Sequence, residues 1–236
     1  MSLLINTKHR TNAVEIMDDF SIQGAVLHDT LDTLASINKW LGGNHVTISA
    51  LKKVLKEHPK NKPITIVDLG CGGGDMLRRI AQFAKKEGYT FKLVGLDANK
   101  DAMAYARRLS KDYGDISFID CDIFSEEFKT LQYDLVLSTL FLHHFIDEQI
   151  IDILSKVKNK AKLGIIVNDL YRHPMAYYLF KLVCLTIKNR MIIEDGLTSI
   201  LRGFKREELK SFSKKLQVTP QIKWKWAFRY QWIIQN

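Results

Sequence analysis

The stretch IVDLGCGGGD, from Ile66 to Asp75, constrains this chain most, because it runs an apolar strand straight into a glycine-rich turn. Glycines let the backbone approach a ligand closely, and the free N–H groups of a helix that starts at about Met76 would point at that ligand. Acidic residues, Asp68 and Asp75, flank the glycines. Phosphate is already negative, so a pyrophosphate turn should not carry them. The turn instead fits a ligand with a cationic end, such as an amino-acid ammonium group.

Strands and helices alternate after this point. The pattern predicts strands at 64–69, 91–96, 116–120, 133–138 and 163–169, with helices at about 75–87, 100–112 and 147–160. Apolar strands between amphipathic helices indicate an α/β fold with a parallel sheet covered on both faces. Right-handed crossovers then bring the carboxyl ends of the strands to one edge, where a ligand should bind. Two alternating runs at 221–226 and 228–234 predict an antiparallel C-terminal hairpin.

Helical segments flank this core in the sequence. Leu27, Leu31, Leu34 and Ile37 recur at helical spacing, and we interpret residues 1–60 as an N-terminal helical segment that serves as a lid. The remainder, 61–236, is expected to be the α/β domain, with a helical insertion at about 171–203 and helices at 174–188 and 204–215. The insertion carries an apolar stripe, which could belong to the core or form the inner face of a lid over a hydrophobic substrate.

Composition narrows the class of protein. The chain has 236 residues, of which 46% are hydrophobic, and a net charge of +9. A surface with this positive net charge favours binding to nucleic acid, anionic membranes or acidic small molecules. The basic residues are scattered along the chain, however, as they are on solvated faces. Three cysteines without framework spacing, no leader-like N-terminus and no apolar run long enough to span a bilayer predict a cytoplasmic protein without a transmembrane segment.

Further candidate residues follow the next three predicted strands. Asp97, with Ala98 after it, follows the second strand, where an acid can accept hydrogen bonds from ribose hydroxyls. Asp122, with Ile123 after it, follows the third and suits an adenine amine and ring. Asp120 competes with Asp122 for this role. The fourth strand leads into the sequence STLFLHH at 138–144, which should face the reacting group.

These four segments, in this order and spacing, resemble the class I S-adenosylmethionine (SAM)-dependent methyltransferases. The match covers roughly residues 60–170. The resemblance implies a Rossmann-like, mostly parallel seven-stranded sheet, with SAM as cofactor and S-adenosylhomocysteine (SAH) as product. Asp68 would hold the methionine end of SAM and Asp97 its ribose. The full expected cofactor set is Asp68, Gly70, Cys71, Gly72, Gly74, Asp97, Ala98, Asp122, Ile123, Thr139 and Leu140.

The candidate catalytic residues are His143 and His144. A neutral imidazole can take a proton from a substrate hydroxyl near pH 7, but either ring could instead pack to hold the loop. Adjacent side chains diverge, so at most one is expected to face the substrate. The expected substrate-side residues are His143, Tyr171, Arg172, His173 and Tyr178. No pattern of histidines and acids predicts a metal site.

Segments at 168–174 and 195–199 also resemble bacterial methyltransferases of small aromatic or polyketide-like molecules. That resemblance predicts O-methylation of a small hydrophobic acceptor by a monomer or homodimer.

Three alternatives stay open. A nucleic-acid methyltransferase fits the charge, but a base-amine methylase would carry Pro-Pro and an aromatic residue after strand four, where this chain has Ser138 to Phe141. An NAD-dependent oxidoreductase is disfavoured by the acids around the glycines. A module that binds SAM without catalysis would have the same cofactor residues.

Overall fold

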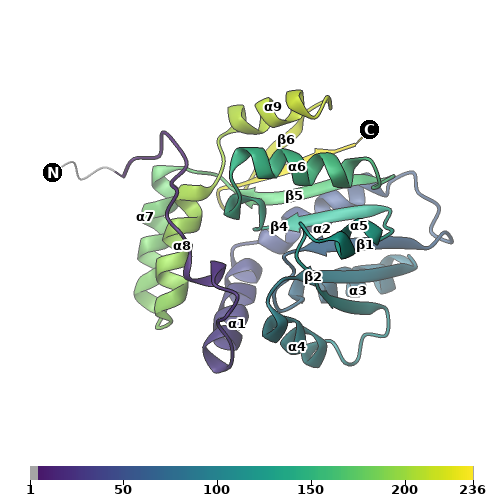
Figure 1. The fold of residues 1–236 in the computed structure, drawn as a ribbon, viewed down its shortest axis with the longest axis horizontal. Helices are drawn as coiled ribbons and strands as arrows, with labels where there is room; N and C mark the ends of the chain where they lie inside the picture. The colour runs from purple at the N-terminus through teal and green to yellow at the C-terminus, as the bar shows by residue number, and fades with distance from the viewer. Residues whose placement is uncertain (1–4, 236) are drawn as a thin grey trace.

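The computed structural model describes residues 5–235, and its centre is a seven-stranded sheet of order β3-β2-β1-β4-β5-β7-β6 (Figure 1). The strands are β1 (Ile64–Leu69), β2 (Phe91–Asp97), β3 (Ile116–Asp120), β4 (Leu135–Thr139), β5 (Gly164–Leu170), β6 (Gln221–Lys225) and β7 (Arg229–Ile234). The first five are parallel, and β7 runs antiparallel to β5 and β6. The expected Rossmann-like sheet and its C-terminal hairpin are confirmed.

The strand order reverses around β1, and this places the glycine turn. β1 pairs with β2 on one side and β4 on the other, so that Leu69 lies opposite both Leu96 and Ser138. The crevice at such a switch point, beyond the carboxyl ends of the strands, is the usual ligand site of open α/β sheets. The turn that follows β1 therefore lies between the ends of β2 and β4.

Helices cover both faces of the sheet. The helices α2 (Gly43–Val54), α3 (Asp75–Glu87) and α4 (Lys100–Leu109) pack on one face, and α5 (Glu126–Thr130), α6 (Asp147–Lys158) and α9 (Arg206–Lys215) pack on the other. An apolar core lies between the sheet and each of these helix layers. The side chains of β1 pack into both cores, since Ile64 and Ile66 face α2, α3 and α4 and Val67 and Leu69 face α5, α6 and α9. Among the described residues, no helix has both the length and the apolar character needed to cross a bilayer.

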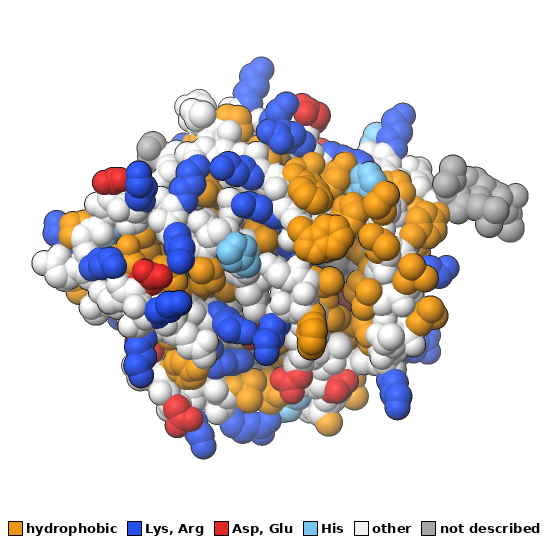
Figure 2. All heavy atoms as spheres, turned by 180° about the vertical axis from the view of Figure 1, so that it is seen from behind, with side chains coloured by type: hydrophobic (Ala, Val, Ile, Leu, Met, Phe, Trp, Pro, Cys, Tyr) orange, Lys and Arg blue, Asp and Glu red, His pale blue; other side chains and the backbone are white. Residues whose placement is uncertain are grey.

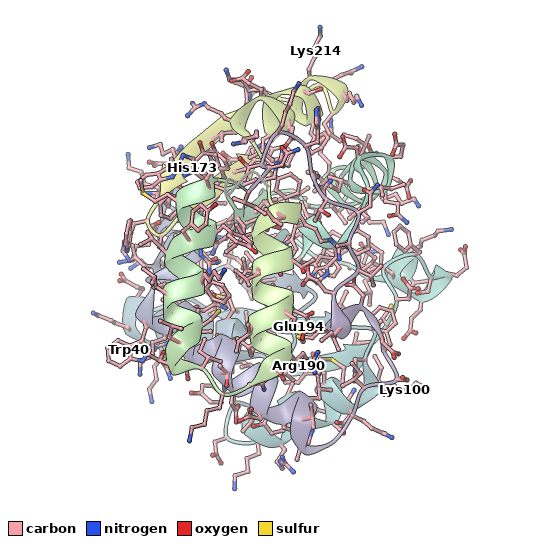
Figure 3. The ribbon with its side chains drawn as sticks, turned by 90° about the vertical axis from the view of Figure 1, so that its left-hand side faces the viewer. Trp40, Lys100, His173, Arg190, Glu194 and Lys214 are labelled. Atoms are coloured by element: carbon pink, nitrogen blue, oxygen red, sulfur yellow. The ribbon has the colours of Figure 1, made fainter. Side chains whose placement is uncertain are left out.

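Three further helices stand beyond the carboxyl edge of the sheet: α1 (Ala25–Trp40), α7 (Pro174–Val183) and α8 (Arg190–Arg202). The chain from residue 5 to 24 runs beside them, and we call it the strap (Figures 1 and 3). The expectation that residues 1–60 are helical throughout is wrong for the strap, whose only helix is the short 3-10 turn Ile16–Asp18. Residues 1–4 lie outside the described residues.

Tertiary contacts, and not an apolar repeat, hold the strap in place. The carboxylate of Asp195 on α8 accepts hydrogen bonds from the backbone N–H groups of Ile16 and Met17, at 2.6 and 2.9 Å. The expected lid at 1–60 also does not include α2. This helix packs on the sheet, where Leu51 and the following Leu55 are fully buried in the core.

Candidate active site

The glycine turn adopts the backbone that its composition predicts. Gly70, Gly72 and Gly74 all have positive φ angles, of 65°, 49° and 72°. A Cβ added at Gly70 would lie 2.1 Å from the ring of Phe141, so that position excludes any side chain. The carboxylate of Asp97 at the end of β2 accepts hydrogen bonds from the N–H groups of Gly72 and Asn99, both at 3.0 Å. Asp97 therefore fixes the turn from the neighbouring strand.

Among the described residues, the acid Asp68 beside this turn has no ion-pair partner. Asp68 is buried, and its Oδ1 has no hydrogen-bond partner among the described residues. Burial, with the nearby carboxylates of Asp75 and Asp97, raises the pKa of Asp68 to about 8. Burial also raises the pKa values of Asp75 and Asp97. A buried carboxylate without a partner is costly, so a cationic ligand group beside it would be stabilised. The ammonium of SAM has that charge, and the residues present fit the cofactor.

A second polar cluster forms where the strap meets the loop after β4. His143 is buried, and its Nδ1 lies 2.7 Å from Oδ1 of Asp169 at the end of β5. His144 lies 2.6 Å from Asp18 of the strap through its Nδ1. A carboxylate only accepts hydrogen bonds, so each Nδ1 carries the proton. In His143 this leaves Nε2 directed toward Glu15 of the strap, at 3.7 Å from Oε1.

The charges of this cluster are coupled. Burial raises the pKa of Glu15 to about 7, against the lowering effect of His144, Ser199 and Arg202. The pKa of Asp18 falls although burial opposes it, because His144 and Arg202 donate hydrogen bonds to its carboxylate. Arg202 lies 2.6 Å from Asp18 and also donates to the backbone oxygens of His143 and His144.

Glu15, His143 and His144 bring potential metal-ligand atoms within 4.8 Å of one another, a grouping that the sequence pattern did not predict. The guanidinium of Arg202 lies 3.6 Å from Oε1 of Glu15, so a cation already faces this carboxylate. We therefore interpret the cluster as a hydrogen-bonded network that positions the histidines.

A cavity of about 910 Å³ joins these two features. On one side its wall is the glycine turn and the loop after β4, and on the other it is the strap, α1, α7, α8 and the turn between β6 and β7. The outer wall is mostly apolar and includes Leu34, Leu179, Leu182, Val183 and Ile192. A mainly apolar cleft of this size with a few convergent polar groups is the usual form of a small-molecule site.

Ten of the predicted site residues line this cavity. They are Asp68, Gly70, Cys71, Gly72, Asp97, Thr139, Leu140, His143, His144 and Tyr171. Both histidines line it, and the expectation that at most one of them faces the substrate stays a prediction. The 3-10 turn Leu142–His144 holds their rings 4.3 Å apart and tilted by 32°, so they reach the same wall.

The other predicted residues lie off the cavity wall. Gly74 caps α3, and Ala98 follows Asp97 at the strand end. Asp122 is exposed and accepts from the N–H of Phe124, while Ile123 is buried in the core. Its competitor Asp120 pairs with Arg107 at 2.5 Å.

Three predicted substrate residues have other partners. Arg172 is buried and bound to Glu208 at 2.6 Å and to backbone oxygens. His173 caps α7 by accepting from the N–H of Met175. Tyr178 accepts from the N–H of Ile5 at 3.1 Å. These groups hold the lid together in the structure.

Several polar cavity residues were missed from the sequence. Glu15 and Asp18 come from the strap, Asn44 lies in the first turn of α2, and Arg229 begins β7. The guanidinium of Arg229 is buried, which lowers its pKa to about 10, and it donates to Asn38 at 2.6 Å. No local pattern marks these residues, because they reach the site only through long-range packing.

With its strands in this order and its ligand edge beside β1, the protein has the fold of the class I SAM-dependent methyltransferases. A family model for a methyltransferase domain matches residues 60–218, and the chain belongs to that family. SAM is the cofactor of this class of enzyme.

The relatives differ in what their names record. The chain is 30% identical over 142 residues to the protein-lysine N-methyltransferase EFM4 of Saccharomyces cerevisiae, a match that covers 58% of this chain and 56% of the yeast protein. The chain thus spans little more than half the length of that relative. The plantazolicin methyltransferase BpumL, solved with SAH, has a TM-score of 0.65 at 17% identity over 87% of this chain and 89% of its own.

An O-methyltransferase family protein from Burkholderia thailandensis has a TM-score of 0.63 at 13% identity, over 95% of this chain and 63% of its own. At such identities the likeness of both structures shows the fold alone.

Proposed function

We propose that the protein transfers the methyl group of SAM to an oxygen of a small, mainly apolar acceptor. The observation that carries this proposal is the continuous cavity, which runs from the acidic glycine turn to an apolar lid and passes the two histidines. The wall that faces the glycine turn comes from the strap, α7 and α8 and is mostly apolar, which favours a small apolar acceptor over a charged lysine side chain or a nucleic-acid strand.

The cofactor end of the cavity binds by charge and by the shape of the turn. Asp68 would face the ammonium group and Asp97 the ribose, and the glycines let the ligand lie against the backbone. When bound, SAM supplies an electrophilic methyl group on a good leaving group. The protein then has to hold the acceptor in line with that methyl and exclude water. The covering lid supports both tasks.

The polar cluster would take the acceptor's proton. Asp169 holds the Nδ1 proton of His143, so Nε2 has the lone pair that a general base needs. As the oxygen–methyl bond forms, the hydroxyl proton passes to Nε2 and the resulting imidazolium lies between Asp169 and Glu15. His144, tied to Asp18, is the second candidate base. An oxygen acceptor, which must lose a proton, makes use of this arrangement.

The decisive experiment is a methyl-transfer assay read by SAH release. Phenols, quinols and alkyl-chain acids are compared with a lysine-containing peptide and with RNA. Turnover confined to the small molecules supports the proposal. Turnover of the peptide alone would favour the activity named for the yeast relative, and turnover of RNA alone a nucleic-acid enzyme. A protein that binds SAM but turns over no acceptor would favour a non-catalytic module. In that case the histidine variants should bind SAM as well as the unchanged chain does.

A further inference from the structure

Large apolar side chains surround the outer opening of the cavity instead of being buried. Leu179 and Leu182 on α7 and Trp226 after β6 line the cavity, yet they are 40%, 61% and 61% exposed. These three residues form what we call the rim. Soluble proteins rarely expose contiguous apolar surface of this kind unless it contacts something.

The apolar surface continues outward from the rim. Trp40 at the end of α1 and Leu185 after α7 are the most exposed large apolar residues on this side, at 86% and 82%. Met175 and Trp224 are exposed as well. Figure 2 shows apolar side chains gathered beside a hollow on this face, and Figure 3 shows Trp40 projecting outward on the side that α7 occupies. The cavity therefore opens through an apolar surface.

The segments that build this surface contain no acidic residue. There is no Asp or Glu in 33–56, which ends α1 and forms α2, in 170–193, which includes α7, or in 209–236, which includes the hairpin. Exposed lysines lie along them: Lys39, Lys181, Lys188 and Lys223. Among the described residues, none of these four lysines forms an ion pair. These segments thus contribute only cationic charge to the border of the apolar surface, although the chain as a whole has 26 acidic residues, and Asp29 of α1 reaches that border through its hydrogen bond with Asn189.

We propose that this face docks on the surface of an anionic phospholipid bilayer. Tryptophan suits the bilayer interface, because its ring is apolar and its N–H can stay hydrated. Lysines at the border can extend to anionic headgroups while their stems cover apolar surface. Nucleic acid fits less well, because Leu179, Leu182 and Leu185, which lie among the tryptophans, offer neither phosphates nor base edges a hydrogen bond. Docking is peripheral, in keeping with the lack of a spanning helix among the described residues.

The second step concerns the acceptor, and it rests on the proposed function. With the rim in contact with lipid, an acceptor with an apolar tail can pass from the bilayer into the cavity without crossing water. The acceptor class is then a lipid-soluble phenol or quinol, whose hydroxyl enters first, toward the histidines. Such an acceptor should be methylated faster when it is presented in anionic vesicles than in detergent.

Docking is tested by flotation of the full chain with vesicles of phosphatidylcholine alone or mixed with phosphatidylglycerol, without SAM or acceptor. We expect binding that requires phosphatidylglycerol, weakens with salt and shifts tryptophan emission to the blue. The double variant Trp40→Ser/Leu185→Ser and the double variant Lys181→Glu/Lys188→Glu should each bind these vesicles about tenfold more weakly, or weaker still. The matched controls Leu109→Ser on α4, and Lys85→Glu with Lys86→Glu on α3, should bind as the unchanged chain does.

Turnover of a short water-soluble acceptor without vesicles should be the same in all of these variants, which separates docking from catalysis. Equal binding to both vesicle compositions, an equal loss in the α3 and α4 controls, or binding to RNA with none to vesicles would overturn the docking proposal. Normal docking without faster methylation of vesicle-borne phenols would overturn the second step alone.

Discussion

At the scale of single residues, the most informative group is a carboxylate with nothing to bind. The free oxygen of Asp68 lies on the cavity wall, and two further carboxylates stand near it. Such an arrangement destabilises the folded protein in its ligand-free state. A group whose pKa is raised on folding contributes stability below its unfolded pKa, and this contribution is lost as the pH rises through the folded pKa. For Asp68 that window runs from about 4 to about 8.

A cationic ligand should reverse this penalty, which leads to a prediction for Asp68. Below pH 8 the carboxyl is protonated in the free protein and must release its proton to bind an ammonium group. The affinity for SAH should therefore rise with pH from 6 to 8, by up to about tenfold per pH unit, and then level off. Calorimetry at several pH values measures this. Asp68→Asn should bind weakly with a flat profile, whereas the exposed control Asp112→Asn should keep the slope. The same slope in Asp68→Asn would contradict the assignment.

A second prediction concerns His143. If its Nε2 takes the acceptor's proton, His143→Ala should lower kcat by about 10² to 10⁴-fold and leave the affinity for SAH unchanged. Asp169→Asn should also slow turnover, because it no longer holds the Nδ1 proton as a carboxylate does. Rapid single-turnover measurements and a melting curve separate catalysis from folding. The control His58→Ala, at a half-buried side chain away from the cavity, should have the activity of the unchanged chain. An unchanged rate in both His143→Ala and His144→Ala would show that no base is needed there.

The residues that sequence could place are those next to a strong local pattern. The glycine turn and Asp97 follow directly from a strand end, and the structure brings them to one wall. Glu15 and Asp18 follow no strand. They reach the site because Asp195 and Arg202 bind the strap across sequence separations of 179 and 184 residues. Asp122 shows the reverse, since a strand-end position alone does not bring a side chain to the cavity.

At the scale of elements, the strap is the part of the lid held by polar contacts. Arg10 binds Asp147 at 2.9 Å and donates to the backbone oxygens of His143, Phe145 and Arg202. Its guanidinium also stacks on a buried phenylalanine of the chain after α8. One side chain thus joins the strap to the loop that carries the histidines.

Removing this side chain should loosen the strap before it affects the core. We expect Arg10→Ala to speed backbone amide exchange over residues 11–22 by about tenfold or more, while exchange in the central strands is unchanged. Hydrogen-exchange mass spectrometry measures both regions in one sample. Lys8→Ala, an exposed neighbour in the strap, is the matched control. Uniformly faster exchange across the sheet would instead identify Arg10 as a residue of global stability.

Sequence periodicity predicted the strands well, because each carries an apolar run with a turn behind it, and β1 and β3 begin and end as expected. It did not resolve α8 within the insertion. Gly196 lies in the middle of that helix and weakens the helical pattern, but a Cβ there would come within 2.4 Å of the Phe180 ring on α7. The close packing of α8 against α7 requires glycine at this position, and the sequence of α8 alone does not reveal that requirement.

At the scale of the whole molecule, the cavity is made by segments that are distant in the sequence. The strap, α1, α7, α8 and the hairpin turn enclose one side, and the sheet edge provides the other. The enclosed volume could not be predicted from the sequence, because it depends on how far the lid stands from the sheet. A ligand that bridges the two should stabilise the molecule as one unit.

Binding of SAH should therefore raise the melting temperature of the full chain. A ligand at about 100 times its Kd adds about 2.7 kcal/mol to the free energy of unfolding, which for 236 residues corresponds to roughly 5–10 °C. Asp97→Ala should remove this shift, because it deletes the acceptor proposed for the ribose and the bonds that fix Gly72. The control Asp112→Asn should retain it. Differential scanning fluorimetry, with amide exchange over the strap measured in parallel, tests both points. An equal rise in Asp97→Ala would place the ligand away from β2, whereas a rise without slower exchange in the strap would mean that binding does not close the lid.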